Sequence, residues 1–100
     1  AISDIERAFQ LGWIEKRSVK NSLINKMELA IEIEKRIDIL EGKLPNKPKI
    51  IKQIERLEKR IDKVLGTVFL KQLKKEYTKG NINEQAYNLL KEDIEWLLAN

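Results

Sequence analysis

Apolar residues in this sequence recur at intervals of three and four instead of alternating, and this spacing constrains the fold more than any other feature. One stripe runs for about six helical turns from Val19 to Leu40, and a second starts at Ile50 and continues to Tyr77. Such stripes are typical of amphipathic helices that bury one face. The predicted buried residues are Val19, Leu23, Met27, Ala30, Ile33 or Ile37, and Leu40, then Ile50, Ile54, Leu57, Ile61, Val64 or Leu65, Val68, Phe69, Leu73 and Tyr77. The sequence therefore predicts an all-α fold, a small bundle built around two long helices.

Capping and stop signals divide the chain into four predicted helices. Ser3 and Glu6 have the spacing of a capping box, which would open a short first helix. Ile82 and Asn83 have the pattern of an apolar staple and an N-cap for a C-terminal helix. The predicted N-caps are Ser3, Ser18 and Asn83, and the predicted stops are Gly12, Gly42 and Lys79-Gly80. After Gly12, Trp13 and Ile14 lie in a connector that we expect to pack back onto the core.

The segment 42–48 holds both prolines and one of the four glycines, so it predicts a break between the two long helices. A short break makes those helices antiparallel neighbours. The first and last helices are too short to extend along the residues nearest the break. We therefore expect one domain, residues 1–100, from which residues 31–61 protrude as a helical-hairpin arm. Gly66 interrupts the second stripe and predicts close approach by another helix, with a kink as the alternative.

Composition excludes most catalytic chemistry. The chain has 100 residues with no Cys and no His, so it lacks thiolates, the commonest general base and the commonest transition-metal ligand. We expect no enzyme activity, no cofactor and no metal site. The carboxylates Glu28, Glu32, Glu34 and Asp38 flank the apolar stripe and predict a solvated face. No apolar run approaches the roughly 20 residues that cross a bilayer, so we expect no membrane insertion.

The net charge of +4 is unevenly distributed, because residues 1–42, 43–79 and 80–100 carry −1, +8 and −3. The candidate binding surface consists of Trp13, Lys49, Lys52, Arg56, Lys59 and Lys63. One interpretation is a solvated face, neutralised by the helix dipole and by neighbouring acidic side chains. The other is a surface for a polyanion, either an anionic cell-surface polymer or nucleic acid.

Nucleic acid is the weaker of these two candidate ligands. The aromatic residues Phe9, Tyr77 and Tyr87 fall on predicted core stripes and do not interleave with the lysines. Trp13, in the connector, is the better candidate for direct contact with a ligand or a protein partner. Pairing of two hairpin arms into a four-helix homodimer is a further possibility.

Two stretches resemble the FIMAH domain, a small helical module at the ends of larger secreted or cell-surface bacterial enzymes. The first matches the family's G, V-x-N-S-L and K-L/M-x-x-A elements with Gly12, Val19-Lys20-Asn21-Ser22-Leu23, Lys26-Met27 and Ala30. The second resembles its F-x-x-x-V, G-x-x-I and A-x-x-L elements with Phe69, Leu73, Lys79-Gly80-Asn81-Ile82, Ala86, Leu89, Leu90, Ile94 and Leu97. Together they cover about half of the chain, and residues 31–61 form a longer stretch than the family pattern contains.

The resemblance implies a non-catalytic accessory module of a larger extracellular or cell-surface protein. Such a module would attach its parent to a cell-surface polymer, a glycan or a protein partner, or act as a spacer. The alternative function is that of a freestanding basic helical protein that binds nucleic acid. No catalytic residue is implied by the resemblance.

Overall fold

The computed structural model describes residues 1–43 and 48–99, and nearly all of them are helical. The elements are α1 (Ile2–Gln10), α2 (Arg17–Glu41), α3 (Pro48–Asp62), the π-helical segment η1 (Lys63–Phe69), α4 (Leu70–Thr78) and α5 (Glu84–Ala99). Within the described residues there is no strand, and an isolated antiparallel bridge joins Ile14 to Ile82. The predicted all-α fold is confirmed. The predicted break at Pro45 falls in residues 44–47, which lie outside the described residues.

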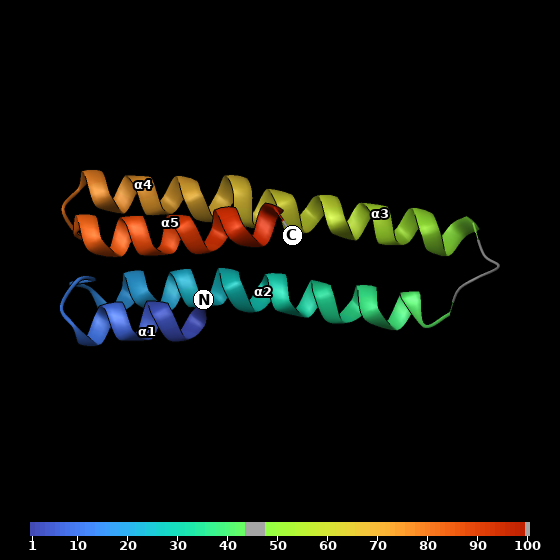
Figure 1. Cartoon of the computed structure of the whole chain (residues 1–100), viewed down its shortest axis with the longest axis horizontal. Helices are drawn as coiled ribbons and strands as arrows, with labels where there is room; N and C mark the ends of the chain where they lie inside the picture. The colour runs from blue at the N-terminus through green and yellow to red at the C-terminus, as the bar shows by residue number, and fades with distance from the viewer. Residues whose placement is uncertain (44–47, 100) are drawn as a thin grey trace.

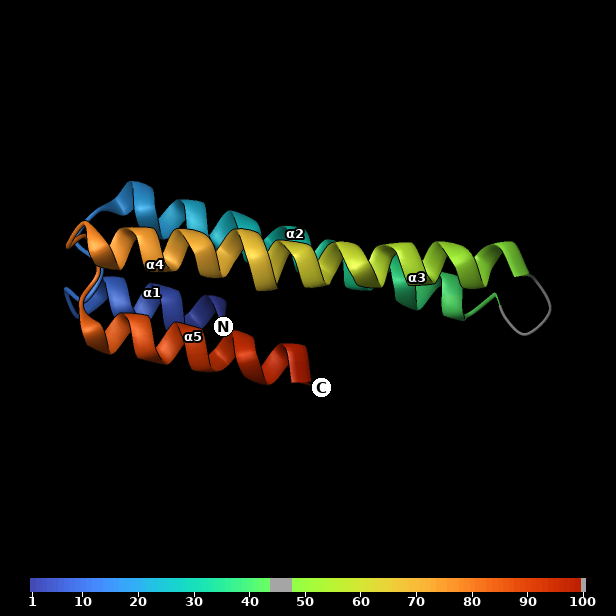
Figure 2. The same cartoon turned by 90° about the horizontal axis from the view of Figure 1, so that it is seen from above.

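The helices form two layers of unequal length (Figures 1 and 2). α2 runs antiparallel to a continuous rod made of α3, η1 and α4, and this long hairpin is the first layer. α1 and α5 form the second layer, which covers only the half of the hairpin farthest from its turn. The molecule measures 50 × 20 × 20 Å. One half is therefore a four-helix body, and the other is a two-helix arm with no second layer.

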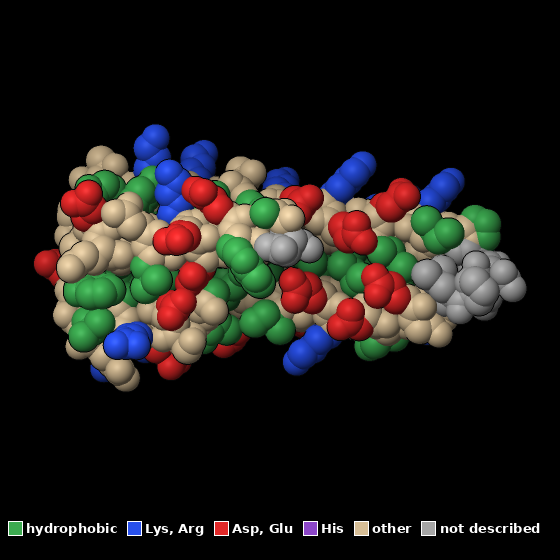
Figure 3. Space-filling view, viewed as in Figure 1, with side chains coloured by type: hydrophobic (Ala, Val, Ile, Leu, Met, Phe, Trp, Pro, Cys, Tyr) green, Lys and Arg blue, Asp and Glu red, His purple; other side chains and the backbone are tan. Residues whose placement is uncertain are grey.

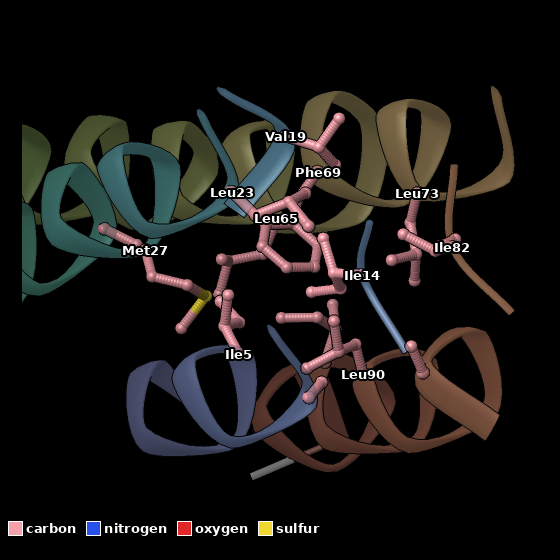
Figure 4. Close-up of a cluster of buried hydrophobic side chains, with 14 of the residues drawn as sticks. Ile5, Ile14, Val19, Leu23, Met27, Leu65, Phe69, Leu73, Ile82 and Leu90 are labelled. Atoms are coloured by element: carbon pink, nitrogen blue, oxygen red, sulfur yellow. The ribbon is translucent and has the colours of Figure 1, made fainter. Parts of the chain in front are cut away.

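The main core lies in the body, between the two layers (Figure 4). Every helix contributes to it, and Ile5, Leu23, Phe69, Leu73 and Leu90 are all fully buried. The core also includes Ile14 and Ile82 from the two connectors, as the position of Ile14 in the sequence predicts. Two residues that the stripes predict to be buried are exposed instead, since Val68 and Tyr77 each have 39% of their surface accessible.

A second, smaller core holds the arm together. It consists of Ile33 and Ile37 from α2 and Ile50 and Ile54 from α3. Leu57 and Ile61 pack against it, and Ile61 also contacts the main core. The alternation of three- and four-residue steps places these side chains on the facing sides of two antiparallel helices, which explains why the arm needs no third helix.

Two glycines fix the connectors at the end of the body farthest from the arm. Gly12 and Gly80 have φ angles of +78° and +80°, the left-handed conformation that only glycine adopts at little cost. The connectors are joined by backbone hydrogen bonds, from Glu15 N–H to the Asn81 carbonyl at 2.9 Å and from Asn83 N–H to the Trp13 carbonyl at 2.9 Å. Asn83 also caps α5, because its Oδ1 accepts the Ala86 N–H at 2.9 Å. The predicted stops and the Asn83 cap are confirmed.

The other two predicted N-caps are wrong. α1 begins at Ile2 with Ala1 as its N-cap, so Ser3 lies inside the helix and makes no capping bond. The earlier start lets Ile2 pack against the core beside Ile5 and Phe9. The N-cap residue of α2 is Lys16, two residues before Ser18, and it makes no side-chain capping bond. Its carbonyl accepts the first hydrogen bonds of the helix, from the N–H groups of residues 19 and 20.

The rod contains a π-helical segment that the sequence does not predict. η1 holds Gly66, and a Cβ added there would meet the Leu98 side chain of α5 at 3.4 Å. This agrees with the predicted close approach of another helix at Gly66. The wider turn of the π-helix accompanies this contact and leaves the rod continuous, with helical dihedral angles at Asp62 and Leu70 on either side.

Candidate functional site

Five cationic side chains lie along one edge of α3 and the start of η1. They are separated by steps of three and four residues, so they form one stripe: Lys49, Lys52, Arg56, Lys59 and Lys63. The stripe lies away from the apolar face that packs on α2, and Arg56 stands at its border, beside a groove between the two helices. All five are exposed, and we call them the basic ridge. At 1.5 Å per residue the ridge is about 21 Å long. Figure 3 shows Lys and Arg side chains projecting along this edge of the molecule.

No ion pair joins the basic ridge to any residue that the structure describes. Among the described residues there is one salt bridge, between Lys91 Nζ and Glu95 Oε1 at 3.8 Å, and it lies within α5. Among these residues, any neutralisation of the ridge by neighbouring acids therefore acts without a direct salt bridge. Five unpaired cations along one straight edge produce a local positive potential that is larger than the net charge suggests.

The ridge continues toward a shallow depression beside η1. The depression has a volume of about 450 Å³, and Lys71, Lys74 and Lys91 stand around it, with Gly66, Thr67, Leu70 and Tyr87 as the other lining residues. Lys63, Thr67 and Lys71 are four residues apart, a spacing that suits the wider π-helical turn. The sequence gives no reason to group these three lysines, since only the fold brings Lys91 of α5 next to α4.

Trp13 does not belong to the same surface as the ridge. It lies in the connector between α1 and α2, at the end of the molecule opposite the arm, and packs half-buried against the main core. Its backbone carbonyl holds the second connector. Trp13 therefore lies apart from the ridge, and contact of its side chain with a ligand or partner stays a prediction. Trp96 is the exposed tryptophan, with 66% of its surface accessible. Its position in the sequence of α5 does not predict this exposure.

Aromatic residues do meet cations, although not on the ridge. The Lys20 ammonium lies 4.9 Å from the centroid of the Phe9 ring, and Lys91 lies 5.7 Å from that of Tyr87. Tyr87 stacks on Tyr77 with ring centroids 4.6 Å apart. The prediction that these aromatic residues are core positions is wrong for Tyr77, which is 39% exposed. The basic ridge itself carries no aromatic side chain for base stacking.

A pair of carboxyl groups lies where the two ends of the chain meet. Asp93 of α5 forms a side-chain hydrogen bond with Asp4 of α1. Asp93 also lines a surface depression together with Ala1, Trp96 and Leu97. Burial, a side-chain hydrogen bond with Asp4 and repulsion from Asp4 together raise the pKa of Asp93 from 3.8 to about 6. Two carboxyls can share a hydrogen bond only when one is protonated, and the Asp93 Oδ2 atom is buried without a partner among the described residues.

Asp93→Asn is expected to stabilise the fold at neutral pH. The pKa of Asp93 rises from 3.8 to about 6 on folding, so the folded state binds more protons in that interval and wild-type stability falls as the pH rises through it. We expect this group to account for about 1 kcal/mol, discounted from the full shift for partial exposure. Urea unfolding of both proteins at about pH 4 and about pH 7 measures the difference. Glu92→Gln, an exposed neighbour, is the control, and an unchanged pH dependence in Asp93→Asn would contradict the assignment.

The described part of the chain meets the requirements of neither a metal centre nor a membrane span. Among the described residues, no group of His, Cys, Asp or Glu side chains has a metal-binding arrangement. In the same part of the chain, no helix combines the length and apolar character needed to cross a membrane.

Comparison with family models, curated proteins and solved structures finds no match to this chain. The resemblance to the FIMAH domain therefore stays a prediction, and the geometry of the site is the basis for a functional proposal.

Proposed function

We propose that the protein is a non-catalytic interaction module that docks an extended anionic polymer of a cell surface along its basic ridge. The observation that carries this proposal is the line of five exposed cations, Lys49, Lys52, Arg56, Lys59 and Lys63, with no salt bridge to any described residue. Such a line favours a ligand with repeated negative charges over a compact anion, because the cations are spread along about 21 Å of helix.

The flat shape of the surface supports a polymer in preference to a small substrate. The depression beside Lys71, Lys74 and Lys91 is open to solvent and continuous with the ridge. A polymer that follows the ridge would also reach these three lysines. Attachment to a cell surface as part of a larger extracellular protein is the role that the FIMAH resemblance suggests for such a module.

Nucleic acid remains the second candidate polyanion. The ridge can neutralise phosphates, which give affinity without sequence selection. However, its five residues include no aromatic side chain and no side chain placed to read bases in a groove. A cell-surface polymer therefore fits the ridge better, and the experiment below compares the two.

The test is co-sedimentation of the protein with purified bacterial cell wall, and separately its binding to duplex DNA, at low and physiological salt. We expect binding to wall that persists at physiological salt. Lys52→Glu combined with Arg56→Glu should weaken it about tenfold or more, through lost attraction and added repulsion. Arg7→Glu combined with Lys35→Glu changes the net charge equally but lies off the ridge, and should retain binding.

The proposal is contradicted if neither polymer binds, if binding disappears at physiological salt, or if both double variants lose affinity equally. Tighter binding to DNA than to wall at physiological salt would establish the nucleic-acid alternative instead. Circular dichroism of each variant ensures that the helices are intact.

A further inference from the structure

The arm has two uncovered faces that differ in charge. α1 and α5 end part-way along the hairpin, so one face of the arm continues the side that they cover in the body (Figure 2). We call this side of the arm the front face and the opposite side the back face. Glu34 marks the front, because it lines a 320 Å³ depression together with Ala1, Ile2 and Ser3 at the start of α1.

The front face is acidic on both helices. Counting helical turns from Glu34 places Asp38 and Glu41 on the same side of α2. On α3, three carboxylates at steps of three and four residues share the side opposite to Gln53 and Arg56, which line the groove on the back face. The front-face carboxylates are Glu34, Asp38, Glu41, Glu55, Glu58 and Asp62, and all six are exposed. Figure 3 shows acidic side chains along both helices of this face, with apolar side chains between them. Ile31 and Ile51 on this face are 37% and 46% exposed.

The back face is an apolar groove between arginines. The groove has a volume of about 380 Å³ and is lined by Arg36, Ile39, Leu40, Gln53, Arg56 and Leu57. Ile39 is 63% exposed, the most exposed aliphatic side chain of the described arm. Arg36 stands on α2 and Arg56 on α3, so a guanidinium flanks the groove on each helix. Arg60, one turn after Arg56, adds a third cation to this side.

We propose that the front face of one copy of this chain docks onto the back face of another. Each face has exposed isoleucine, and the charges are complementary: the front face has six carboxylates, and the back face has Arg36, Arg56 and Arg60 beside the carboxylate Glu32, which lies one turn before Arg36. Symmetric pairing of two front faces would oppose carboxylates, and pairing of two back faces would oppose arginines. The predicted homodimer of facing arms is therefore the less favourable arrangement.

Because α1 and α5 end part-way along the hairpin, the front face of the arm leaves room for a second copy. The front face lies one helix layer below the surface of α1 and α5, and a layer is about 8–10 Å thick. The arm of a second copy would fill this missing layer and form a four-helix segment. Because the docked copy keeps its own front face free, the contact does not close on itself and can add further copies.

The size of the arm indicates a weak contact. The 15 residues of α3 give the arm a length of about 22 Å, and the molecule is 20 Å across. Each copy would bury about 400 Å², roughly half of the area per partner in a standard stable interface. We therefore expect concentration-dependent association at low salt, observable between about 10 µM and about 1 mM and dispersed by about 0.5 M salt.

Single-face variants test this arrangement. Asp38→Lys with Glu58→Lys disables the front face, and Arg36→Glu with Ile39→Glu disables the back face. These four residues are exposed and lie off the basic ridge, so the outcome is independent of polymer binding. Lys35→Glu, on the outer edge of α2, is the control and should associate like the wild type. Circular dichroism and thermal unfolding verify that each variant is folded.

Sedimentation velocity gives the decisive result. Wild type should exceed 11.8 kDa as concentration rises, and each single-face variant should remain a monomer. An equimolar mixture of the two variants should form species of twice that mass and no larger, since each contributes one working face. A wild type that stays monomeric throughout, a mixture that stays monomeric, or single-face variants that still associate alone would each overturn the proposal.

Discussion

Phe69→Ala is expected to lower the free energy of unfolding by about 3–5 kcal/mol. The ring is fully buried in the main core, where residues from both layers surround it (Figure 4). Removing it deletes a large apolar surface and leaves a cavity that the surrounding helices fill only in part. A domain of this size has about 5–15 kcal/mol of stability in total, so the variant would lose about a fifth or more of it. Urea unfolding followed by circular dichroism measures the loss.

Val68→Ala is the matched control for that experiment. Val68 lies next to Phe69 in η1 and is 39% exposed, so its truncation should cost less than about 1 kcal/mol. Similar losses in the two variants would mean that the π-helical segment, and not the buried ring, determines the stability at this position.

Ile54→Ala is expected to open the arm while the body stays folded. Ile54 belongs to the small core of four isoleucines, and truncation of such a residue costs about 2–4 kcal/mol. The arm has few other buried contacts, so this cost is a large part of its local stability. Native-state hydrogen exchange should show faster exchange of the α3 amides and of the amides at the end of α2, while amides near Phe69 keep their protection.

Ile51→Ala provides the same chemical change at an exposed position, because Ile51 is 46% accessible. It should leave exchange in the arm nearly unchanged. Equal acceleration of amides throughout the molecule in Ile54→Ala would contradict independent opening and indicate that the arm and the body unfold as one cooperative unit.

The sequence is informative where local chemistry decides the structure. Gly12, Gly80 and Asn83 each satisfy a requirement of the backbone within a few residues, and the structure confirms all three. The stripe of α2 from Val19 to Ile37 is also buried as predicted. In these cases the spacing and the residue type contain all the information that is needed.

Predictions fail where tertiary contacts outweigh local preference. Ser3 has a capping-box pattern, but an earlier start of α1 lets Ile2 join the core, and apolar burial outweighs a cap worth about 1 kcal/mol. The start of α2 is fixed by connector hydrogen bonds to residues 81 and 83, which are far away in the sequence. The π-helical turn in η1 likewise depends on α5, since Leu98 lies against Gly66.

The candidate surfaces also combine features that the sequence predicts with features that only the fold reveals. The three- and four-residue steps between Lys49 and Lys63 predict a shared stripe, and the structure places them on one edge. Trp13 does not share this edge, since its connector lies at the end of the molecule opposite the arm. Only the fold reveals this separation. The opposite charges of the two arm faces could not be predicted until the sides covered by α1 and α5 were known.

Ala1 and Leu97 line the same depressions near the middle of the long axis, away from both the arm tip and the connectors. A tether attached beside these two residues would hold the molecule at its middle. The 50 Å long axis would then lie across the tether, with the arm on one side and the body on the other.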